Sequence, residues 1–168
     1  MSENIRLAGI VGDSITDGVG LRMTIFTQGC PHKCKGCHNP ETHDFNGGYE
    51  ITPTDLIDKI DSSHIITGVT FSGGEPMCQA KALLPVAQHI KKRGLHLAIY
   101  SGFTYEQLLT MGDDVMNLLK LTDVLVDGKF DITKKSMDLK FMGSTNQRPI
   151  NIQESLKQNK IILAPSWL

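Results

Sequence analysis

"RMTIFTQGCPHKCKGCHNP", residues 22–40, joins a strand-like segment to a tight group of cysteines. β-branched and apolar residues run from Met23 to Thr27 and predict a strand that stops at Gly29. A C-x3-C-x2-C arrangement follows directly, made of Cys30, Cys34 and Cys37. The sequence therefore places three thiols on a loop at the end of a strand.

Strand-like and helix-like segments alternate along the rest of the chain. Strand character returns in residues 67–74, 95–102 and 123–126. Apolar residues at helical spacing predict helices in residues 52–60, 79–93 and 113–120. Short apolar strands separated by helices favour parallel pairing through right-handed crossovers. We therefore expect an α/β fold, either a parallel βα sheet or part of a barrel.

Local signals support three of the helix boundaries. Thr52 precedes Pro53 as an N-cap precedes a first helical position. Thr104 stands three residues before a glutamine, which is the spacing of a capping box. Gly94 is a stop signal for the helix of residues 79–93. Pro85 either kinks that helix or belongs to the first turn of a helix that begins there.

Each predicted strand is followed by residues suited to ligand contact. The first strand leads to the cysteines, and the next three lead to SGGEP (72–76), YSG (100–102) and DGK (127–129). In parallel α/β folds the reactive groups gather at the carboxyl ends of the strands. The four groups are therefore expected to share one rim.

Composition limits the class of protein. The chain has 168 residues, of which 40% are hydrophobic, so we expect a single domain spanning residues 1–168. A formal net charge of −1 gives no reason to expect a nucleic acid or an anionic membrane as partner. The start of the chain lacks a secretory signal pattern, and we expect a cytoplasmic protein. In that reducing compartment, clustered cysteines indicate metal or redox chemistry.

Three thiolates leave one coordination direction open, and two metal sites fit. A structural zinc ion would recruit His38 or Cys78 as its fourth ligand. A [4Fe-4S] cluster would instead keep one iron for an outside ligand. Cys78 by itself is expected to be a buried thiol that packs as a small hydrophobe near a helix start.

The cysteine triad followed by GGEP (73–76) resembles the radical S-adenosylmethionine superfamily. More narrowly, four segments are similar to the anaerobic ribonucleoside-triphosphate reductase-activating family, which belongs to the glycyl-radical enzyme activases. These segments are DGVGLRMTIFTQGCPHKCKGCHNPETHD (17–44), TFSGGEP (70–76), DVLVDGKF (123–130) and GSTNQR (143–148). The resemblance thus covers nearly the whole chain.

The resemblance implies a fold, a reaction and its partners. The fold would be a parallel βα barrel of the radical S-adenosylmethionine type, and the length of 168 residues predicts a partial (incomplete) one that is open at one side for a protein loop. The cysteines would hold three irons of a [4Fe-4S] cluster, and S-adenosyl-L-methionine would chelate the fourth. Reductive cleavage of this cofactor would give a 5′-deoxyadenosyl radical, which removes hydrogen from a glycine of the anaerobic ribonucleoside-triphosphate reductase. A flavodoxin-type protein would supply the electron.

The resemblance also assigns residues. Cofactor contacts carry over onto Gly36, Cys37, His38, Gly73, Gly74, Glu75, Ser101, Asp127 and Lys129. No side chain is expected to act as a general acid or base. Gly36 departs from the family, which often has an aromatic residue at this position. The Asn146–Arg148 segment is expected near the active face or the reductase, and Trp167 is expected to anchor the C-terminal tail.

Three other functions remain open from the sequence. The nearest is activation of pyruvate formate-lyase, by a member of the same activase class. Another is radical chemistry on a small molecule, which would need no protein partner. The most distant is a structural zinc module without enzymatic activity.

Overall fold

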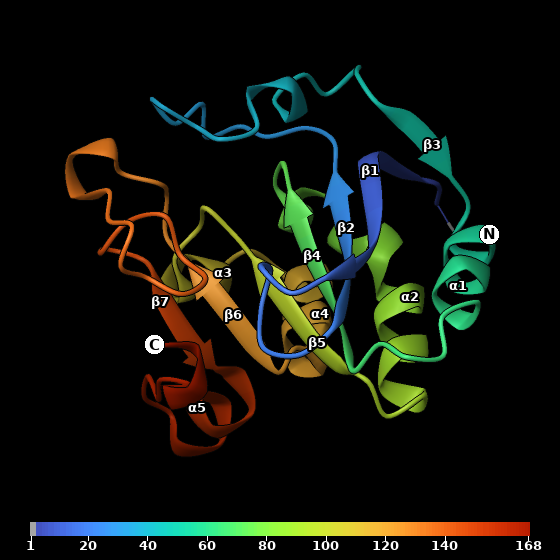
Figure 1. The fold of residues 1–168 in the computed structure, drawn as a ribbon. Coiled ribbons are helices and arrows are strands. Elements are labelled where there is room, and N and C mark those ends of the chain that lie inside the picture. Colours follow the sequence, from blue (N-terminus) through green and yellow to red (C-terminus); the bar gives the residue numbers. More distant parts are fainter. Residues whose placement is uncertain (1–2) are drawn as a thin grey trace.

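The computed structural model describes residues 3–168 and builds them around one seven-stranded sheet (Figure 1). The strands are β1 (Ile5–Ser14), β2 (Arg22–Thr27), β3 (Tyr49–Ile51), β4 (Gly68–Gly73), β5 (His96–Tyr100), β6 (Val124–Asp127) and β7 (Arg148–Asn151). Their order across the sheet is β3-β1-β2-β4-β5-β6-β7. Because β3 and β7 lie at opposite edges, the sheet is not closed.

The pairing is parallel only in the middle of the sheet. The pairs β2–β4, β4–β5 and β5–β6 are parallel, as the alternation of strands and helices predicts. The pairs β1–β2, β1–β3 and β6–β7 are antiparallel. The expectation of a purely parallel sheet is therefore wrong at both edges, because β1 and β7 return beside their neighbours without a crossover helix.

Helices cover one face of the sheet. They are α1 (Pro53–Asp61), α2 (Ala80–Lys92), α3 (Tyr105–Leu108), α4 (Asp113–Leu121) and α5 (Ile152–Gln158). Helix α2 packs between α1 and α4. In Figure 1, α4 lies behind β5 and β6, whereas α1 stands to the right of β1. No helix within residues 3–168 has the length and apolar character needed to cross a membrane.

The main core lies between the sheet and these helices. Side chains alternate between the two faces of a strand, so Val69 and Phe71 of β4 point into this core and are fully buried. Thr70 between them faces the other way and contacts polar groups. The strands therefore have one apolar face for the helices and one mixed face, which the connecting loops and the C-terminal tail cover.

Trp167 anchors the tail on that second face, as the sequence predicts. Its side chain is 2% exposed and stacks on His96 with the ring centroids 5.9 Å apart. The guanidinium carbon of Arg22 lies 5.5 Å from the indole centroid. Burial lowers the pKa of Arg22 to about 10, so this side chain remains charged at neutral pH.

The local helix signals have the predicted effects. The Thr52 hydroxyl accepts a hydrogen bond from Asp55 N at 3.1 Å, and Thr104 and Gln107 form both bonds of a capping box. Pro85 lies inside α2, which begins five residues earlier at Ala80. The alternative that a helix begins at Pro85 is therefore wrong.

Candidate functional site

The carboxyl ends of β2, β4, β5 and β6 surround a cavity of about 120 Å³. Its walls include Cys30, His32, Cys34, Cys37, Ser72, Gly73, Gly74, Tyr100, Ser101, Gly102, Gly128, Lys129, Phe130 and Gln147. Residues from all four of the predicted strand-end groups are present. The expectation of one shared rim is therefore confirmed.

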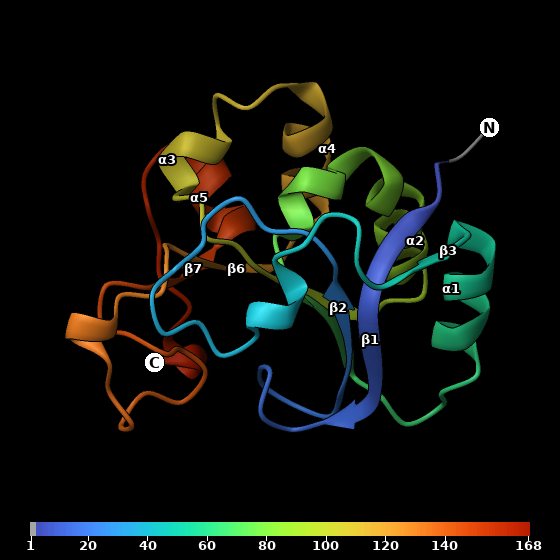
Figure 2. The same cartoon turned by 90° about the horizontal axis from the view of Figure 1, so that it is seen from above.

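The cysteine loop arches over this end of the sheet, and Figure 2 looks down on it from above. Its first residues are held by backbone hydrogen bonds on two sides. Gly29 N donates to Thr42 O at 2.7 Å, and Cys30 N donates to His43 O at 3.2 Å. From the other side, Glu75 N donates to Gly29 O at 2.8 Å. The first cysteine is thus fixed between β4 and the segment that follows the loop.

All three thiols of the loop are free and face the cavity. Burial raises the pKa of Cys30 and of Cys34 above the ordinary value. A backbone hydrogen bond from His32 opposes this rise at Cys30, and one from Phe130 opposes it at Cys34. A bound metal would replace the thiol protons, since it is the thiolate that ligates.

Two glycines bring the ends of β2 and β4 into close contact. Gly73 has a φ of +93°, and a Cβ there would lie 2.7 Å from the backbone N and O of Thr27. A Cβ on Gly74 would lie 2.4 Å from the carbonyl oxygen of Gly29. Contacts within the chain therefore require glycine at both positions, whether or not a ligand binds in the cavity.

The structure separates the predicted cofactor residues into two groups. Those that line the cavity are Cys37, Gly73, Gly74, Ser101 and Lys129; those that do not are Gly36, His38, Glu75 and Asp127. Gly36 and His38 are exposed, and the His38 ring centroid lies 5.1 Å from that of Phe130. Cofactor contact by any of these residues stays a prediction.

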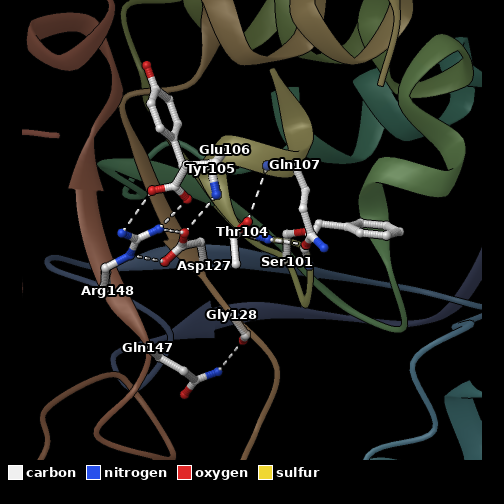
Figure 3. Close-up of polar contacts among 10 residues, drawn as sticks. Ser101, Thr104, Tyr105, Glu106, Gln107, Asp127, Gly128, Gln147 and Arg148 are labelled. Atoms are coloured by element: carbon white, nitrogen blue, oxygen red, sulfur yellow. Dashed lines mark hydrogen bonds and ion pairs between the residues drawn. The ribbon is translucent and has the colours of Figure 1, made fainter. Parts of the chain in front are cut away.

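Asp127 is buried in an ion-pair network at the edge of the site (Figure 3). Arg148 donates from Nε to Oδ1 of Asp127 at 3.0 Å and from Nη2 to Oδ2 at 2.5 Å. Tyr105 N, at the start of α3, donates to Oδ2 at 2.7 Å. Arg148 also donates to both carboxylate oxygens of Glu106, at 3.2 and 2.8 Å. This network joins the ends of β6 and β7 to α3.

The Asp127 network borders a second hollow, of about 540 Å³. Its walls include Thr104, Glu106, Gln107, Asp127, Asn146 and Arg148. Gly102, Gly128 and Lys129 line both this hollow and the cysteine cavity. The GSTNQR segment therefore lies beside the cysteines, as the sequence predicts for the active face.

Sequence reasoning missed His32, and it was wrong about Cys78. The imidazole of His32 lines the cavity and lies 2.6 Å from Glu75. Its place between the first two cysteines is the one sequence signal that could have identified it. Cys78 does stand near the start of α2, but it is exposed and outside the cavity walls. It lies in a short 3₁₀ turn, Pro76–Gln79, in which Pro76 and Met77 are buried and Cys78 is not.

The donor set of the cavity fits an iron–sulfur cluster. Three soft thiols face one space from a single loop, and some of the other polar wall groups are engaged elsewhere, as in the hydrogen bond from Tyr100 to Phe141 O at 2.8 Å. In a cluster each sulfur binds its own iron, so the thiolates surround the cluster. Within residues 3–168, no three His, Cys, Asp or Glu side chains meet closely enough to hold a single metal ion.

We expect Glu106→Gln to lower the free energy of unfolding at neutral pH but not at strongly acidic pH. The hydrogen bond from Arg148 lowers the pKa of Glu106 below 4.5, so the ionised carboxylate stabilises the fold above that pH. This contribution disappears as the pH falls through the folded-state pKa. Because Glu106 is largely exposed, the loss should be about 1 kcal/mol or less. Urea unfolding at pH 7 and pH 3 measures the difference.

The control for this prediction is Glu41→Gln. Glu41 is exposed and has no ion pair within residues 3–168. It should show no pH-dependent loss. An equal loss for Glu106→Gln at both pH values would show that its charge does not matter.

The chain matches a protein family and several known proteins. The model of the 4Fe-4S single cluster domain family matches residues 16–150. The anaerobic ribonucleoside-triphosphate reductase-activating protein of Vibrio cholerae is 35% identical over 142 residues, which are 79% of this chain and 89% of that protein. Its counterpart in Escherichia coli K12 is 32% identical over 141 residues, covering 79% of this chain and 90% of the relative.

A relative with a different name is also similar to this chain. The pyruvate formate-lyase-activating enzyme of Clostridium pasteurianum is 38% identical over 141 residues, or 77% of this chain. The chain spans only 58% of that relative's length. The family match includes the three cysteines, the GGEP segment and all four residues of the Asp127 network. The chain therefore belongs to the 4Fe-4S single cluster domain family, together with the anaerobic ribonucleoside-triphosphate reductase-activating proteins.

Proposed function

We propose that this protein activates an anaerobic ribonucleoside-triphosphate reductase by forming a glycyl radical on it. The observation that carries the proposal is the convergence of three free thiols on one cavity at the carboxyl ends of four parallel strands. Relatives with the activating-protein name are matched over about nine-tenths of their length. Site chemistry and family membership therefore support the same function, with residues 1–168 acting as one domain.

Cys30, Cys34 and Cys37 are the residues that would hold the [4Fe-4S] cluster. When bound, the cluster supplies the electron that cleaves S-adenosyl-L-methionine reductively. The cavity of about 120 Å³ is small for the cluster and that cofactor together, but it adjoins a hollow of about 540 Å³. The larger volume falls in the range of about 300–1,000 Å³ that is usual for small-molecule pockets. We propose that S-adenosyl-L-methionine extends from the first space into the second.

The chain's own residues would bind and orient that cofactor. The backbone at Gly73 and Gly74 lines the cavity and can approach a methionine group closely. Ser101 lies across the cavity at the end of β5. Lys129 lines both spaces with an exposed ammonium group, which suits a carboxylate. None of these roles requires proton transfer by a side chain.

The open sheet suits a protein substrate. The edge strands β3 and β7 lie at opposite sides of the sheet, and we propose that the sheet is a partial barrel into which a flexible loop of the reductase enters from the open side. Positioning a glycine close to the reacting atom is the main task of the protein here, since the cofactor carries the chemistry. We further propose a flavodoxin-type electron donor and a cytoplasmic location.

Activation of pyruvate formate-lyase is the second candidate. The 38% identity to the Clostridium pasteurianum enzyme favours it. The reductase remains the first candidate, because its activators are matched over 89% and 90% of their own length.

Anaerobic purification followed by metal analysis and electron paramagnetic resonance tests the proposal. We expect iron and sulfide in a [4Fe-4S] ratio, and a reduced-cluster signal that changes when S-adenosyl-L-methionine is added. The protein is then mixed separately with an anaerobic ribonucleoside-triphosphate reductase and with pyruvate formate-lyase, together with the cofactor and a reductant. A glycyl-radical signal on the reductase supports the first candidate, and one only on pyruvate formate-lyase supports the second. Stoichiometric zinc without any cluster after reconstitution would refute both.

A further inference from the structure

One contact holds the middle of the cysteine loop in place, and the importance given to it here rests on the proposed cluster site. Glu75 is 0% exposed, and its carboxylate is hydrogen-bonded on all sides. Four groups donate to it: His32 Nε2 at 2.6 Å, Ser101 Oγ at 2.9 Å, Gly102 N at 2.8 Å and Met77 N at 3.0 Å. A carboxylate has about four acceptor positions. Glu75 is therefore fully occupied by the protein itself.

His32 is the donor that comes from the cysteine loop. Its side chain is 5% exposed, and its ring packs edge-on against Phe103 with the centroids 4.5 Å apart. Gly102 leaves room for it, since a Cβ there would lie 2.3 Å from the imidazole. The ring thus fills a slot built by the segment that follows β5. Loss of the imidazole would leave one acceptor position of a buried charge unfilled, which is costly.

The rest of the loop has few other attachments. Between residues 31 and 38, the described chain shows one hydrogen bond from a non-sulfur atom to residues outside the loop, and it is the His32–Glu75 bond. The bond from Cys37 N to Cys34 O lies within the loop. The backbone of His32 also hydrogen-bonds to the thiol of Cys30. Any movement of His32 would therefore change the surroundings of two cysteines.

We propose that His32 is a positioning residue for the iron–sulfur cluster. Held by Glu75, to which Ser101 also donates, it fixes the segment between the first two cysteines against the ends of β4 and β5. It thereby places Cys34 at the cavity and keeps its own backbone N–H directed at the Cys30 sulfur. Hydrogen bonds to cluster sulfurs influence the reduction potential, so this anchor also sets the potential at which the cluster accepts an electron.

Two substitutions of His32 separate its hydrogen bond from its shape. His32→Phe keeps a flat ring but removes the donor, whereas His32→Gln keeps a donor of similar reach. The control is His89→Phe, because His89 also pairs with a carboxylate, Asp61 at 2.8 Å, but in a more exposed place near the end of α2. All variants are made in the full chain.

The first measurement is amide hydrogen exchange of residues 30–38 in cluster-free protein with reduced thiols. Loss of a hydrogen bond to a buried charge should speed exchange in His32→Phe by about tenfold or more. His32→Gln should stay near the wild-type rate, and His89→Phe should match it. A folded His32→Phe variant with unchanged exchange would overturn the proposal.

The second measurement is the midpoint potential and the electron paramagnetic resonance spectrum of the reconstituted cluster. We expect both to change in His32→Phe and to return toward wild type in His32→Gln. If His32→Phe does not fold, Ser101→Ala replaces it, since it removes one donor from Glu75 and should speed loop exchange less. Unchanged exchange in Ser101→Ala would then count against the anchor. Because exchange is measured without cofactor, it can succeed even where cleavage of S-adenosyl-L-methionine, and so the proposed function, fails.

Discussion

A Cys34→Ser variant is expected to keep its fold but lose its cluster, and with it all activation of a reductase. Cys34 lines the cavity, and a serine hydroxyl is a poor ligand for the soft iron–sulfur site. Removing a residue that only supports a metal ligand commonly lowers metal affinity or activity by about 10–100-fold. Removing a ligand itself should therefore lower the affinity for the cluster by at least about 100-fold. Iron and sulfide per chain after anaerobic reconstitution measure the effect, and circular dichroism checks the fold.

Cys78→Ser is the matched control for this prediction. It makes the same chemical change at a thiol that is exposed and outside the cavity. It should retain wild-type iron content and activity. Retention of the cluster in Cys34→Ser, or its loss in Cys78→Ser, would place the iron somewhere other than this cavity.

The second large effect is expected for Gly73→Ala. The backbone at Gly73 has a φ of +93°, and the new methyl group would lie 2.7 Å from backbone atoms of Thr27. Backbone strain and overpacking each cost about 1–3 kcal/mol, so the free energy of unfolding should fall by about 3 kcal/mol or more. The collision is with backbone, which cannot rotate away as a side chain does. Urea unfolding of cluster-free protein under reducing conditions measures this loss.

Gly94→Ala separates the two causes. Gly94 has a similar φ of +73°, but a Cβ there would meet no atom within 4 Å. This variant should therefore lose only about 1–2 kcal/mol, the cost of a left-handed backbone for alanine. Equal losses in the two variants would mean that β2 and β4 move apart to admit the methyl group.

Much of the central fold could be predicted because its signals are local. The strands at β2, β4, β5 and β6 are apolar runs with clear ends, and the caps at Thr52 and Thr104 act within one helical turn. The alternation of these elements is enough to predict parallel pairing in the middle of the sheet. The shared rim then follows, because parallel strands end at the same edge.

The outer parts of the fold could not be predicted in the same way. Strand β7 and helix α5 lie in a region where the sequence pattern is weak, and β7 includes a proline, Pro149. A proline removes a hydrogen-bond donor and is tolerated near a sheet edge. The antiparallel direction of β7 comes from its pairing with β6, which is a long-range contact. Local propensity carries no information about that direction.

The site shows the same division. The sequence by itself determined that three thiols lie together on a loop after a strand, because their spacing along the chain limits how far apart they can be. Only the tertiary structure decided what surrounds them. Glu75 is paired with a histidine 43 residues away, and Asp127 with an arginine 21 residues away. A buried carboxylate takes whatever donors the fold brings to it, and such partners are invisible until distant segments pack together.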